Sequence, residues 1–464
     1  MKRLVSLIFA ALVLAGCGET VGPRKFIPEN PAVLDLEYAQ NSEWLPAPAP
    51  ASVQNISGKA FKSRYFKIWF DDAPIKAEID TFWGLNYAKG RHFDAAGRIY
   101  NDAVYQSIRA NANEEAFGLI SAPAITVKNA LLRNIPSDLP IFGDPSEPGE
   151  GEPFDYAANS AVSVGYPLLL SHYSRDGAWA FVRNDGVWGW IRSDAIKRIS
   201  PQQADIYANS KFITILREGA AIYDESGAEL FRARTGTILP YDFSGERDLG
   251  GTLGVRNVFS GEILTQFGAK RYLVSAEDAR LWPAPLDEQN SKIVAASLLG
   301  QKYGWGGYKF LRDCSLMTKD FLANFGLWLP RNSKAQSGRG ERFSLAGMSA
   351  DEKLSFIGKN GVAYKTLLYM PGHVMLYVGR VDGKPAVLHD IWGLRTMDGG
   401  RAVIGRTAIT SLTIGSDRAD IAEDRLLISR ISAMSVLSGE DDAISDDRFA
   451  PEDPGTLSAY ASGN

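Results

Sequence analysis

The chain has 464 residues, of which 45% are hydrophobic and 22% are charged, a composition typical of soluble globular domains. Its length allows about two to four domains. Lys and Arg number 50 and Asp and Glu number 54, and the net charge of −4 argues against a nucleic-acid partner, which requires a basic face. Beyond the N-terminal segment, no apolar run is long enough to predict a transmembrane helix.

The N-terminus has the pattern of an export signal. Met1-Lys2-Arg3 precedes an apolar run, residues 4–14, that is too short to span a bilayer but suits a secretory signal. The run ends in Leu14-Ala15-Gly16-Cys17, which resembles a bacterial lipobox and implies that residues 1–16 are removed and Cys17 is lipidated. We therefore expect a lipid-anchored protein of the bacterial cell envelope, in the outer membrane and facing the periplasm. An ordinary cleaved signal with an incidental cysteine is the alternative.

Residues 17–32 are polar and contain prolines, which predicts a tether between the membrane anchor and the folded part of the chain. Residues 33–118 are expected to form a helix-rich N-terminal stabilising region, with helical character from Ile99 to Asn111. This region has no catalytic constellation. Its histidine, His92, stands beside Arg91 and is expected to be a solvated surface residue.

A strong hairpin signal lies between residues 119 and 200. Two apolar runs, 178–182 and 187–191, are joined by a turn that contains Asp185-Gly186. With the short turn expected at 193–196, the pattern resembles a bacterial SH3 domain. The long loop 143–156 precedes the hairpin, and its terminal aromatic residues indicate that it docks on another part of the protein.

Short strands at similar spacing recur between residues 205 and 283 and predict a second SH3-like barrel. The expected strands are 214–216, 221–223, 237–239 and 271–274. Pro283-Ala284-Pro285 then marks a linker to the last domain, residues 286–432.

Cys314 is expected in the first turn of a helix. Apolar residues recur behind it at helical spacing until Gly326 ends the run. The helix dipole and unpaired N–H groups of a first turn favour the thiolate, which is the nucleophile of cysteine catalysis. If Cys17 carries lipid, Cys314 has no intramolecular disulfide partner, and a thiol kept in an oxidising compartment indicates chemistry.

Two of the four histidines lie on one predicted hairpin. Residues 371–380 read as a strand with His373 near its start, and residues 386–392 return with His389. An imidazole can take the thiol proton and later protonate a leaving amine, and a second polar group must orient it. A Cys-His-His metal site is an alternative, although the rest of a zinc signature is absent. A purely structural hairpin is the other.

Taken in order, these motifs resemble the NlpC-type papain-like cysteine peptidases of the cell wall. They are Tyr303-Gly304-Trp305-Gly306-Gly307, Asp313-Cys314-Ser315, Leu329-Pro330-Arg331-Asn332-Ser333 with Gln336, Gly372-His373-Val374 with Tyr377-Val378-Gly379, and His389. The resemblance implies an α+β chain in which a papain-like domain follows two SH3-like barrels and the N-terminal region. One departure is Leu316, where the family usually has glycine; on the helix it should alter packing more than chemistry.

The resemblance also implies an activity, the hydrolysis of the γ-D-glutamyl–meso-diaminopimelate bond of peptidoglycan stem peptides in cell-wall turnover or recycling. Cys314 would attack the carbonyl and form a thioester, His373 would act as general base and then general acid, and His389 would orient His373. No metal or organic cofactor is needed. The alternatives are a catalytically inactive peptidoglycan-binding lipoprotein and a papain-like acyltransferase.

By the same resemblance, Tyr303 lies beside the nucleophile, where its hydroxyl would hold the oxyanion together with the backbone N–H of Cys314. Asp313 and Ser315 would line the substrate groove.

The loop 143–156 suggests a hypothesis about substrate choice. A stem peptide that has been cut from its sugar has a free amino terminus, whereas one still in the wall has an amide there. We expect one carboxylate of Glu150, Glu152 and Asp155, together with Asp313, to pair with that ammonium and so select free peptides. Tyr156 would form the wall of the pocket. The competing interpretation is a loop that packs only on its own barrel.

The C-terminal residues, 433–464, are expected to be an acidic disordered tail, because residues 439–454 are rich in Asp and Glu and cannot support a core.

Overall fold

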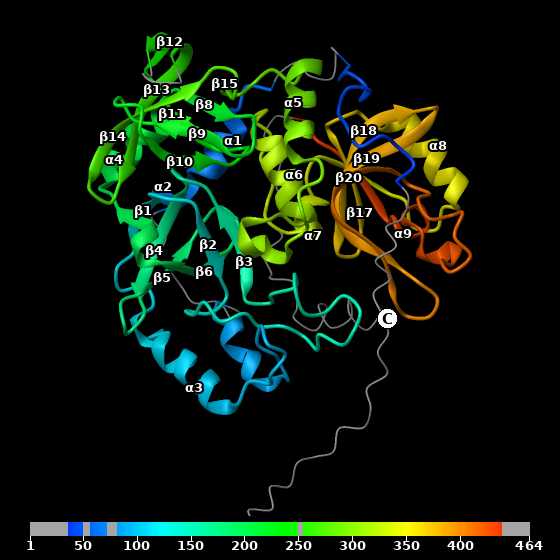
Figure 1. Ribbon diagram of the computed structural model, residues 1–464, viewed down its shortest axis with the longest axis horizontal. Helices are drawn as coiled ribbons and strands as arrows, with labels where there is room; N and C mark the ends of the chain where they lie inside the picture. The colour runs from blue at the N-terminus through cyan, green and yellow to red at the C-terminus, as the bar shows by residue number, and fades with distance from the viewer. Residues whose placement is uncertain (1–35, 50–55, 72–80, 249–253, 439–464) are drawn as a thin grey trace, which may run out of the picture.

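The structure is a computed structural model that describes residues 36–49, 56–71, 81–248 and 254–438. The expected signal peptide, Cys17, the tether 17–32 and residues 439–464 lie outside the described residues. Figure 1 shows two β lobes stacked beside a larger lobe that holds the last domain, with α6 between them. The α+β fold class is confirmed. Among the described residues, no helix is long and apolar enough to cross a membrane.

The N-terminal region is spread over the other lobes. Its described elements are α1 (Lys59–Tyr65), α2 (Lys67–Phe70), η2 (Trp83–Lys89), α3 (Asp102–Asn111) and η3 (Glu114–Ala116). The α1–α2 pair packs on the first barrel, where Trp69 donates its indole N–H to the carbonyls of Ala124 and Leu168 at 3.0 and 3.1 Å. The segment 36–49 instead covers the last domain, where Leu45 is part of the core. The N-terminal region therefore contacts both the first barrel and the last domain.

His92 is half-buried, and its predicted place on the solvated surface is wrong. Its ring packs edge-on against Tyr87, and its Nδ1 lies 3.4 Å from the hydroxyl of Tyr105. This burial lowers the pKa of His92. These contacts were not predictable from the residues next to His92, because Tyr87 lies on η2 before it and Tyr105 lies on α3 after it.

The first barrel forms a seven-stranded sheet in the order β3-β2-β6-β5-β4-β1-β7. The strands are β1 (Ala122–Thr126), β2 (Ala130–Arg133), β3 (Ala158–Val162), β4 (Pro167–Tyr173), β5 (Trp179–Arg183), β6 (Trp188–Arg192) and β7 (Ile196–Arg198), with the turn η4 (Ser193–Ala195). The predicted hairpin is confirmed as β5–β6. Its turn residue Asp185 accepts hydrogen bonds from Lys319 and Trp328 of the last domain at 2.8 and 2.6 Å.

After α4 (Pro201–Asn209), the second barrel combines a five-stranded sheet, β10-β9-β14-β13-β12, with a three-stranded sheet, β11-β8-β15. The strands are β8 (Phe212–Ile215), β9 (Ala220–Tyr223), β10 (Glu229–Ala233), β11 (Ile238–Pro240), β12 (Phe243–Asp248), β13 (Val255–Thr265), β14 (Gly268–Ser275) and β15 (Ala279–Leu281). The four predicted strands correspond to β8, β9, β11 and β14. The hairpin β12–β13 was not expected, because β12 is largely polar and exposed.

The last domain is built on a six-stranded antiparallel sheet in the order β16-β21-β17-β18-β19-β20. Its strands are β16 (Glu341–Ser344), β17 (Thr366–Met370), β18 (His373–Val381), β19 (Lys384–Arg395), β20 (Arg401–Ser411) and β21 (Ala433–Val436). Its helices are α5 (Glu288–Leu298), η5 (Trp305–Phe310), α6 (Cys314–Ala323), α7 (Ser333–Gln336), α8 (Ala350–Asn360), η6 (Glu423–Arg425) and α9 (Leu427–Arg430).

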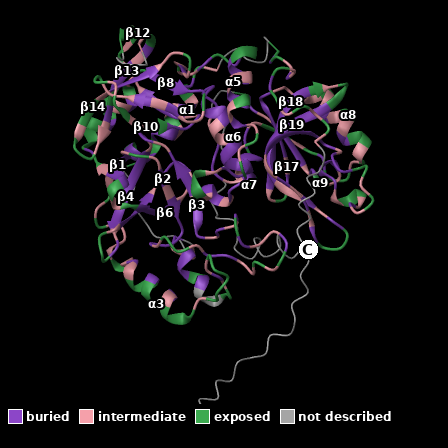
Figure 2. Ribbon diagram, in the orientation of Figure 1, coloured by how far each residue is buried: buried purple, intermediate pink, exposed green. Residues whose placement is uncertain are grey.

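Both faces of this sheet are buried (Figure 2). Alternate residues of β18 point to opposite faces, as a pleated strand requires. Val374 and Leu376 pack with the α5 and α6 helices, and Met375 packs with α8 and α9. Cys314 on α6 therefore packs on the face of the sheet that Val374 and Leu376 line, beside the end of the sheet where β18 starts.

The predicted start of the disordered tail at residue 433 is wrong. Residues 433–436 form β21, which pairs antiparallel with both β16 and β17. Met434 is fully buried, because the short apolar stretch ahead of the acidic residues completes the sheet. The predicted tail began too early because the acidic composition of residues 439–454 was extended back to residue 433.

Candidate active site

Cys314 is the first residue of α6, as predicted. Asp313 is the N-cap, and its Oδ1 accepts a hydrogen bond from the backbone N–H of Leu316 at 2.9 Å. The cysteine is 7% exposed, and its Sγ lies 3.9 Å from the carbonyl oxygen of Gly372. The helix end favours the thiolate, and the contact with Gly372 sets the nucleophile beside the residue that precedes His373.

The two hairpin histidines meet. The Nε2 of His373 and the Nδ1 of His389 are 2.9 Å apart, and the Nε2 of His389 is 3.0 Å from the hydroxyl of Thr410. Because the Nε2 of His373 contacts His389, the Nδ1 of His373 is the ring nitrogen that can exchange a proton with a nucleophile. If that atom accepts the thiol proton, its Nε2 carries hydrogen and donates to His389, whose own Nε2–H then donates to Thr410. The sequence did not indicate Thr410.

Both imidazoles are neutral near pH 7. Burial, with a smaller effect of Arg430, lowers the pKa of His373 to about 3. Burial and the neighbouring His373 lower the pKa of His389 well below its usual range. A neutral His373 is able to take up the proton of a thiol, as a general base must.

Comparison with protein families matches three segments of the chain. Residues 140–192 match an SH3 domain of SH3b1 type, residues 200–246 match an SH3 domain of SH3b2 type, and residues 300–396 match the NlpC/P60 family. The last domain is an NlpC/P60 domain. The predicted family and the two SH3-like domains before it are confirmed, and the domain is a papain-like cysteine peptidase domain of the type that acts on peptidoglycan.

Solved structures extend the likeness beyond the NlpC/P60 domain. An NlpC/P60 endopeptidase from Photobacterium damselae subsp. piscicida is similar over 88% of this chain and 99% of its own, with 23% identity and a TM-score of 0.74. An NlpC/P60 family protein from Bacillus cereus ATCC 10987 matches over 68% of this chain and 99% of its own, with 16% identity and a TM-score of 0.42. The first likeness shows that the fold is shared across all the lobes. Comparison with curated proteins gave no match.

Asp313 and Ser315 are committed to internal bonds in the NlpC/P60 domain and do not present free polar groups to a groove, contrary to expectation. Arg331 binds both carboxylate oxygens of Asp313, at 3.0 and 2.6 Å, and donates to the Ser315 hydroxyl at 2.8 Å. Although burial opposes ionisation, Arg331 holds the pKa of Asp313 below its usual range. Arg331 was missed because it starts a polar run that reads as a surface loop.

Tyr303 is buried beside the nucleophile. Burial first, and then the Cys314 and Asp313 charges, raise its pKa well above the usual range. Its hydroxyl therefore stays protonated and able to donate a hydrogen bond. The ring packs against Phe154 of the first barrel and Trp392 of β19, with centroids 5.6 and 6.1 Å away.

The loop 143–156 docks on the NlpC/P60 domain, as expected, through one of its two terminal aromatic residues. Phe154 packs against Tyr303, Trp305 and Trp392. The other loop aromatic, Tyr156, is half-buried within the first barrel, where its carbonyl accepts hydrogen bonds from Tyr87 and Asn134. Of the two terminal aromatic residues, Phe154 therefore makes the contact with the NlpC/P60 domain.

The acidic side chains of this loop have separate environments. Asp155 is fully buried, pairs with Arg133 at 3.1 Å and accepts two backbone N–H groups, so it cannot meet a substrate. Glu150 accepts a hydrogen bond from the hydroxyl of Tyr156. Glu152 is exposed and forms an ion pair with Lys309.

The glycine-rich approach to Cys314 is shaped by the first barrel. Gly306 and Gly307 have φ values of 61° and 82°, which favour glycine. A Cβ on Gly307 would also lie 2.6 Å from the backbone nitrogen of Ala161 on β3. Ser160 on the same strand accepts a hydrogen bond from Arg331 at 3.1 Å. The barrel thus contacts both the glycine loop and the arginine that holds Asp313.

The residue after His389 is an unexpected buried acid. Asp390 is fully buried, and neither of its carboxylate oxygens has a hydrogen-bond partner among the described residues. Thr407 lies opposite it on β20, and its hydroxyl only partly opposes the rise in the pKa of Asp390. Burial first, and then the charge of Asp313, raise the pKa of Asp390 well above its usual range.

We expect Asp390→Asn to stabilise the protein at neutral pH. The raised pKa of the folded state means that Asp390 costs stability once the unfolded chain ionises, so the cost is absent below about pH 4 and grows by up to about 1.4 kcal/mol per pH unit above it. The variant lacks this cost. Urea unfolding between pH 4 and pH 7 checks this, with Asp242→Asn as an exposed control. A gain that does not grow with pH would show that Asp390 is ionised in the folded protein.

Proposed function

We propose that this chain is a cysteine endopeptidase that hydrolyses the γ-D-glutamyl–meso-diaminopimelate bond of peptidoglycan stem peptides, in cell-wall turnover or recycling. The observation that carries the proposal is the pairing of His373 with His389 on a hairpin whose first residues adjoin Cys314, since the Sγ of Cys314 lies 3.9 Å from the carbonyl oxygen of Gly372. The match of the last domain to the NlpC/P60 family supports the broader activity, the hydrolysis of peptidoglycan.

The reaction has two steps. His373 takes the proton of Cys314 on Nδ1 while the sulfur attacks the carbonyl carbon of the scissile amide, and the oxyanion forms. We assign its stabilisation to the hydroxyl of Tyr303 and the backbone N–H of Cys314. The C–N bond then breaks, His373 returns the proton to the leaving amine, and a thioester remains. Water attacks the thioester with His373 again as base, which releases the acid and restores the thiol.

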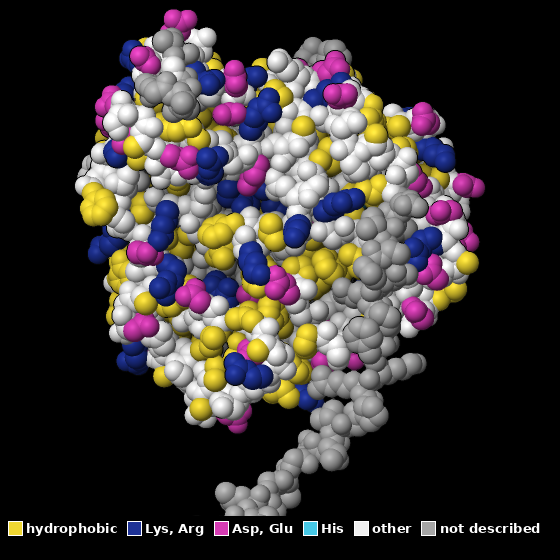
Figure 3. Space-filling view, in the orientation of Figure 1, with side chains coloured by type: hydrophobic (Ala, Val, Ile, Leu, Met, Phe, Trp, Pro, Cys, Tyr) yellow, Lys and Arg dark blue, Asp and Glu magenta, His cyan; other side chains and the backbone are white. Residues whose placement is uncertain are grey.

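The surface between the lobes supports an anionic peptide as substrate. Figure 3 shows hydrophobic and basic side chains gathered across the middle of the face in view, where the barrels adjoin the NlpC/P60 domain. Stem peptides carry several carboxylates. Glu150, Glu152 and Asp155 are the loop carboxylates considered for binding a free amino terminus, and among them Glu152 is the exposed one. We therefore keep Glu152 in that role. Tyr156 follows it in the same loop.

The proposal is tested by product analysis. The protein is incubated with purified sacculi, with free L-Ala-γ-D-Glu-diaminopimelate and with the N-acetylated tripeptide, and the products are identified by mass. We expect L-Ala-D-Glu and diaminopimelate from the free tripeptide. Cleavage at another bond, or none, would contradict the proposal.

The same assay tests Glu152. If Glu152 pairs with the substrate ammonium, Glu152→Gln should lower turnover of the free tripeptide and leave the acetylated one unchanged. Glu147→Gln, on the same loop, is the matched control. An unchanged ratio would remove Glu152 from the site.

We also propose that the protein is anchored to the outer membrane, facing the periplasm, by lipid on Cys17. The support is the segment Leu14-Ala15-Gly16-Cys17 alone. The mass of the mature N-terminal peptide tests it, and an unlipidated peptide would refute it.

A further inference from the structure

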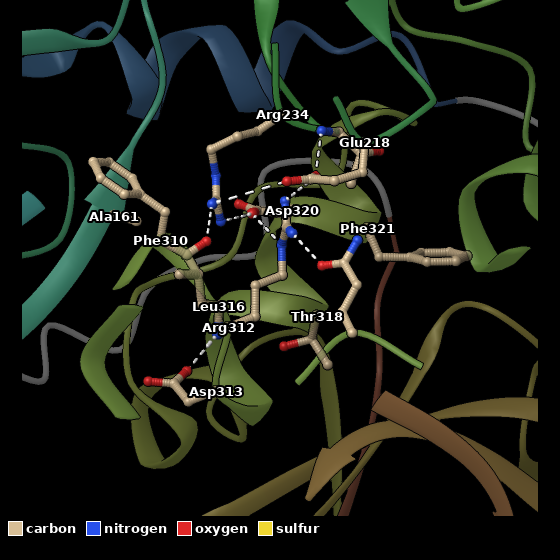
Figure 4. A network of polar contacts seen from close by, with 12 residues as sticks. Ala161, Glu218, Arg234, Phe310, Arg312, Asp313, Leu316, Thr318, Asp320 and Phe321 are labelled. Carbon is tan, nitrogen blue, oxygen red and sulfur yellow. Dashed lines mark hydrogen bonds and ion pairs between the residues drawn. The ribbon is translucent and has the colours of Figure 1, made fainter. Parts of the chain in front are cut away.

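The residue before the N-cap of α6 is the centre of a buried ion network. Arg312 is fully buried, and each nitrogen of its guanidinium has an acceptor. Nε binds Asp320 of α6 at 2.8 Å, Nη1 binds the side chain of Gln301 at 2.8 Å, and Nη2 binds Glu218 at 2.7 Å (Figure 4). Glu218 belongs to the second barrel, between β8 and β9. An arginine buried this deeply depends on all of its partners.

Both the barrel and the last domain hold Glu218 in place. Its carboxylate accepts the backbone N–H of Thr235 at 2.9 Å, and its own backbone N–H bonds to Ser297 of α5. Although burial opposes ionisation, the charges of Arg312 and Arg234 hold the pKa of Glu218 below its usual range. The carboxylate is therefore a fixed charge at neutral pH.

A second arginine of the barrel reaches the loop that leads to the nucleophile. Arg234 donates to the backbone carbonyl of Phe310 and lies 3.5 Å from Asp320. Lys309 and Phe310 have φ values of 53° and 62°, a conformation that is costly for residues with side chains and persists only where the surroundings impose it. Arg234 is one of the groups that impose it.

The same barrel also binds the helix of the nucleophile further along. Thr214 of β8 donates to the side chain of Asn324 at 2.7 Å, and Gly236 lies against the backbone of Asp320 with no room for a side chain. The second barrel thus contacts the loop before Cys314, the residue two positions before it, and the C-terminal end of α6 at Asp320 and the C-cap Asn324.

We propose that the second SH3-like barrel is a positioning element of the active site, in which Glu218 and Arg234 set the place of Cys314 through Arg312 and the loop 305–312. The proposal goes beyond the assigned reaction, although it rests on Cys314 being the nucleophile. Neither residue touches the reacting atoms, so their effect should fall on turnover and thiol reactivity.

The test replaces Glu218 by Gln, which keeps the shape of the side chain and removes its charge. We expect kcat on the free tripeptide to fall between about tenfold and about a hundredfold with KM nearly unchanged, because small displacements of a nucleophile have effects of this size. The rate of Cys314 alkylation by iodoacetamide, read from the mass of the labelled peptide, should change as well. Glu229→Gln is the matched control, because it removes an exposed ion pair on the same barrel.

Arg234→Lys is the second variant, in case Glu218→Gln does not fold. It keeps the charge but cannot donate to Phe310 and Asp320 with one planar group, so kcat and alkylation should change in the same direction. Folded variants with normal kcat and normal alkylation would overturn the proposal, as would a loss seen only in binding to sacculi. Alkylation needs no substrate, so it tests this inference even where the proposed bond proves wrong.

Discussion

Cys314→Ala is expected to lower hydrolysis of the stem peptide by at least about 10⁴-fold, and His373→Ala by a similar factor, with the fold kept. The first removes the attacking sulfur, and the second removes the base that takes its proton. The measurement is initial rate on the free tripeptide, with circular dichroism as the check of folding. His92→Gln is the matched histidine control, because His92 lies outside the site and should leave the rate unchanged.

The effects of Cys314→Ala and His373→Ala on the rate of hydrolysis should not be additive. Once the nucleophile is gone, its base has nothing to activate, so the double variant should be no slower than Cys314→Ala alone. His389→Ala should cost less than His373→Ala, and His389→Asn should recover part of the loss, because its amide can still accept the hydrogen bond from His373. A Cys314→Ala variant with half the normal rate would refute the assignment.

Arg331→Met is expected to lower the free energy of unfolding by about 3–5 kcal/mol, because it leaves Asp313 as a buried charge without its counter-ion. It should also lower turnover, since Asp313 caps the helix that begins with Cys314. Adding Asp313→Asn should restore part of the stability, because the amide oxygen can still cap the helix without a charge. Chemical denaturation followed by circular dichroism measures the free energy of unfolding of the single and the double variant.

Arg98→Met is the control for this prediction. It removes a surface ion pair with Asp94, which solvent screens, and should change the free energy of unfolding far less than Arg331→Met does. If Arg331→Met costs as little, or if the double variant is no more stable than the single one, the Asp313–Arg331 pair does not hold the start of α6.

The parts of the site that the sequence predicted are those set by local patterns. Cys314 at a helix start followed from apolar spacing and Gly326, and the meeting of His373 and His389 followed from one hairpin. The partners of these residues were missed where they are distant in sequence. Nothing near Arg312 in the chain points to Glu218, which is 94 residues away.

Composition misled in two further places. The polar run that starts at Arg331 is typical of a surface loop, although the guanidinium of Arg331 is buried against Asp313. The loop 143–156 was correctly expected to dock, but two aromatic side chains of similar character stand two residues apart, and only packing against Trp392 distinguishes Phe154 from Tyr156. Sequence patterns predict which segments make contact more readily than which atoms do.

The last strand of the sheet carries a consequence for protein synthesis. Because β21 lies between β16 and β17, a growing chain that has not yet reached residue 436 leaves two sheet edges open in the middle of the domain. Open edges invite pairing with other chains, so a premature stop just before this strand should yield an aggregation-prone product. The six-stranded sheet can therefore be completed only after β21 has been synthesised and has left the ribosome.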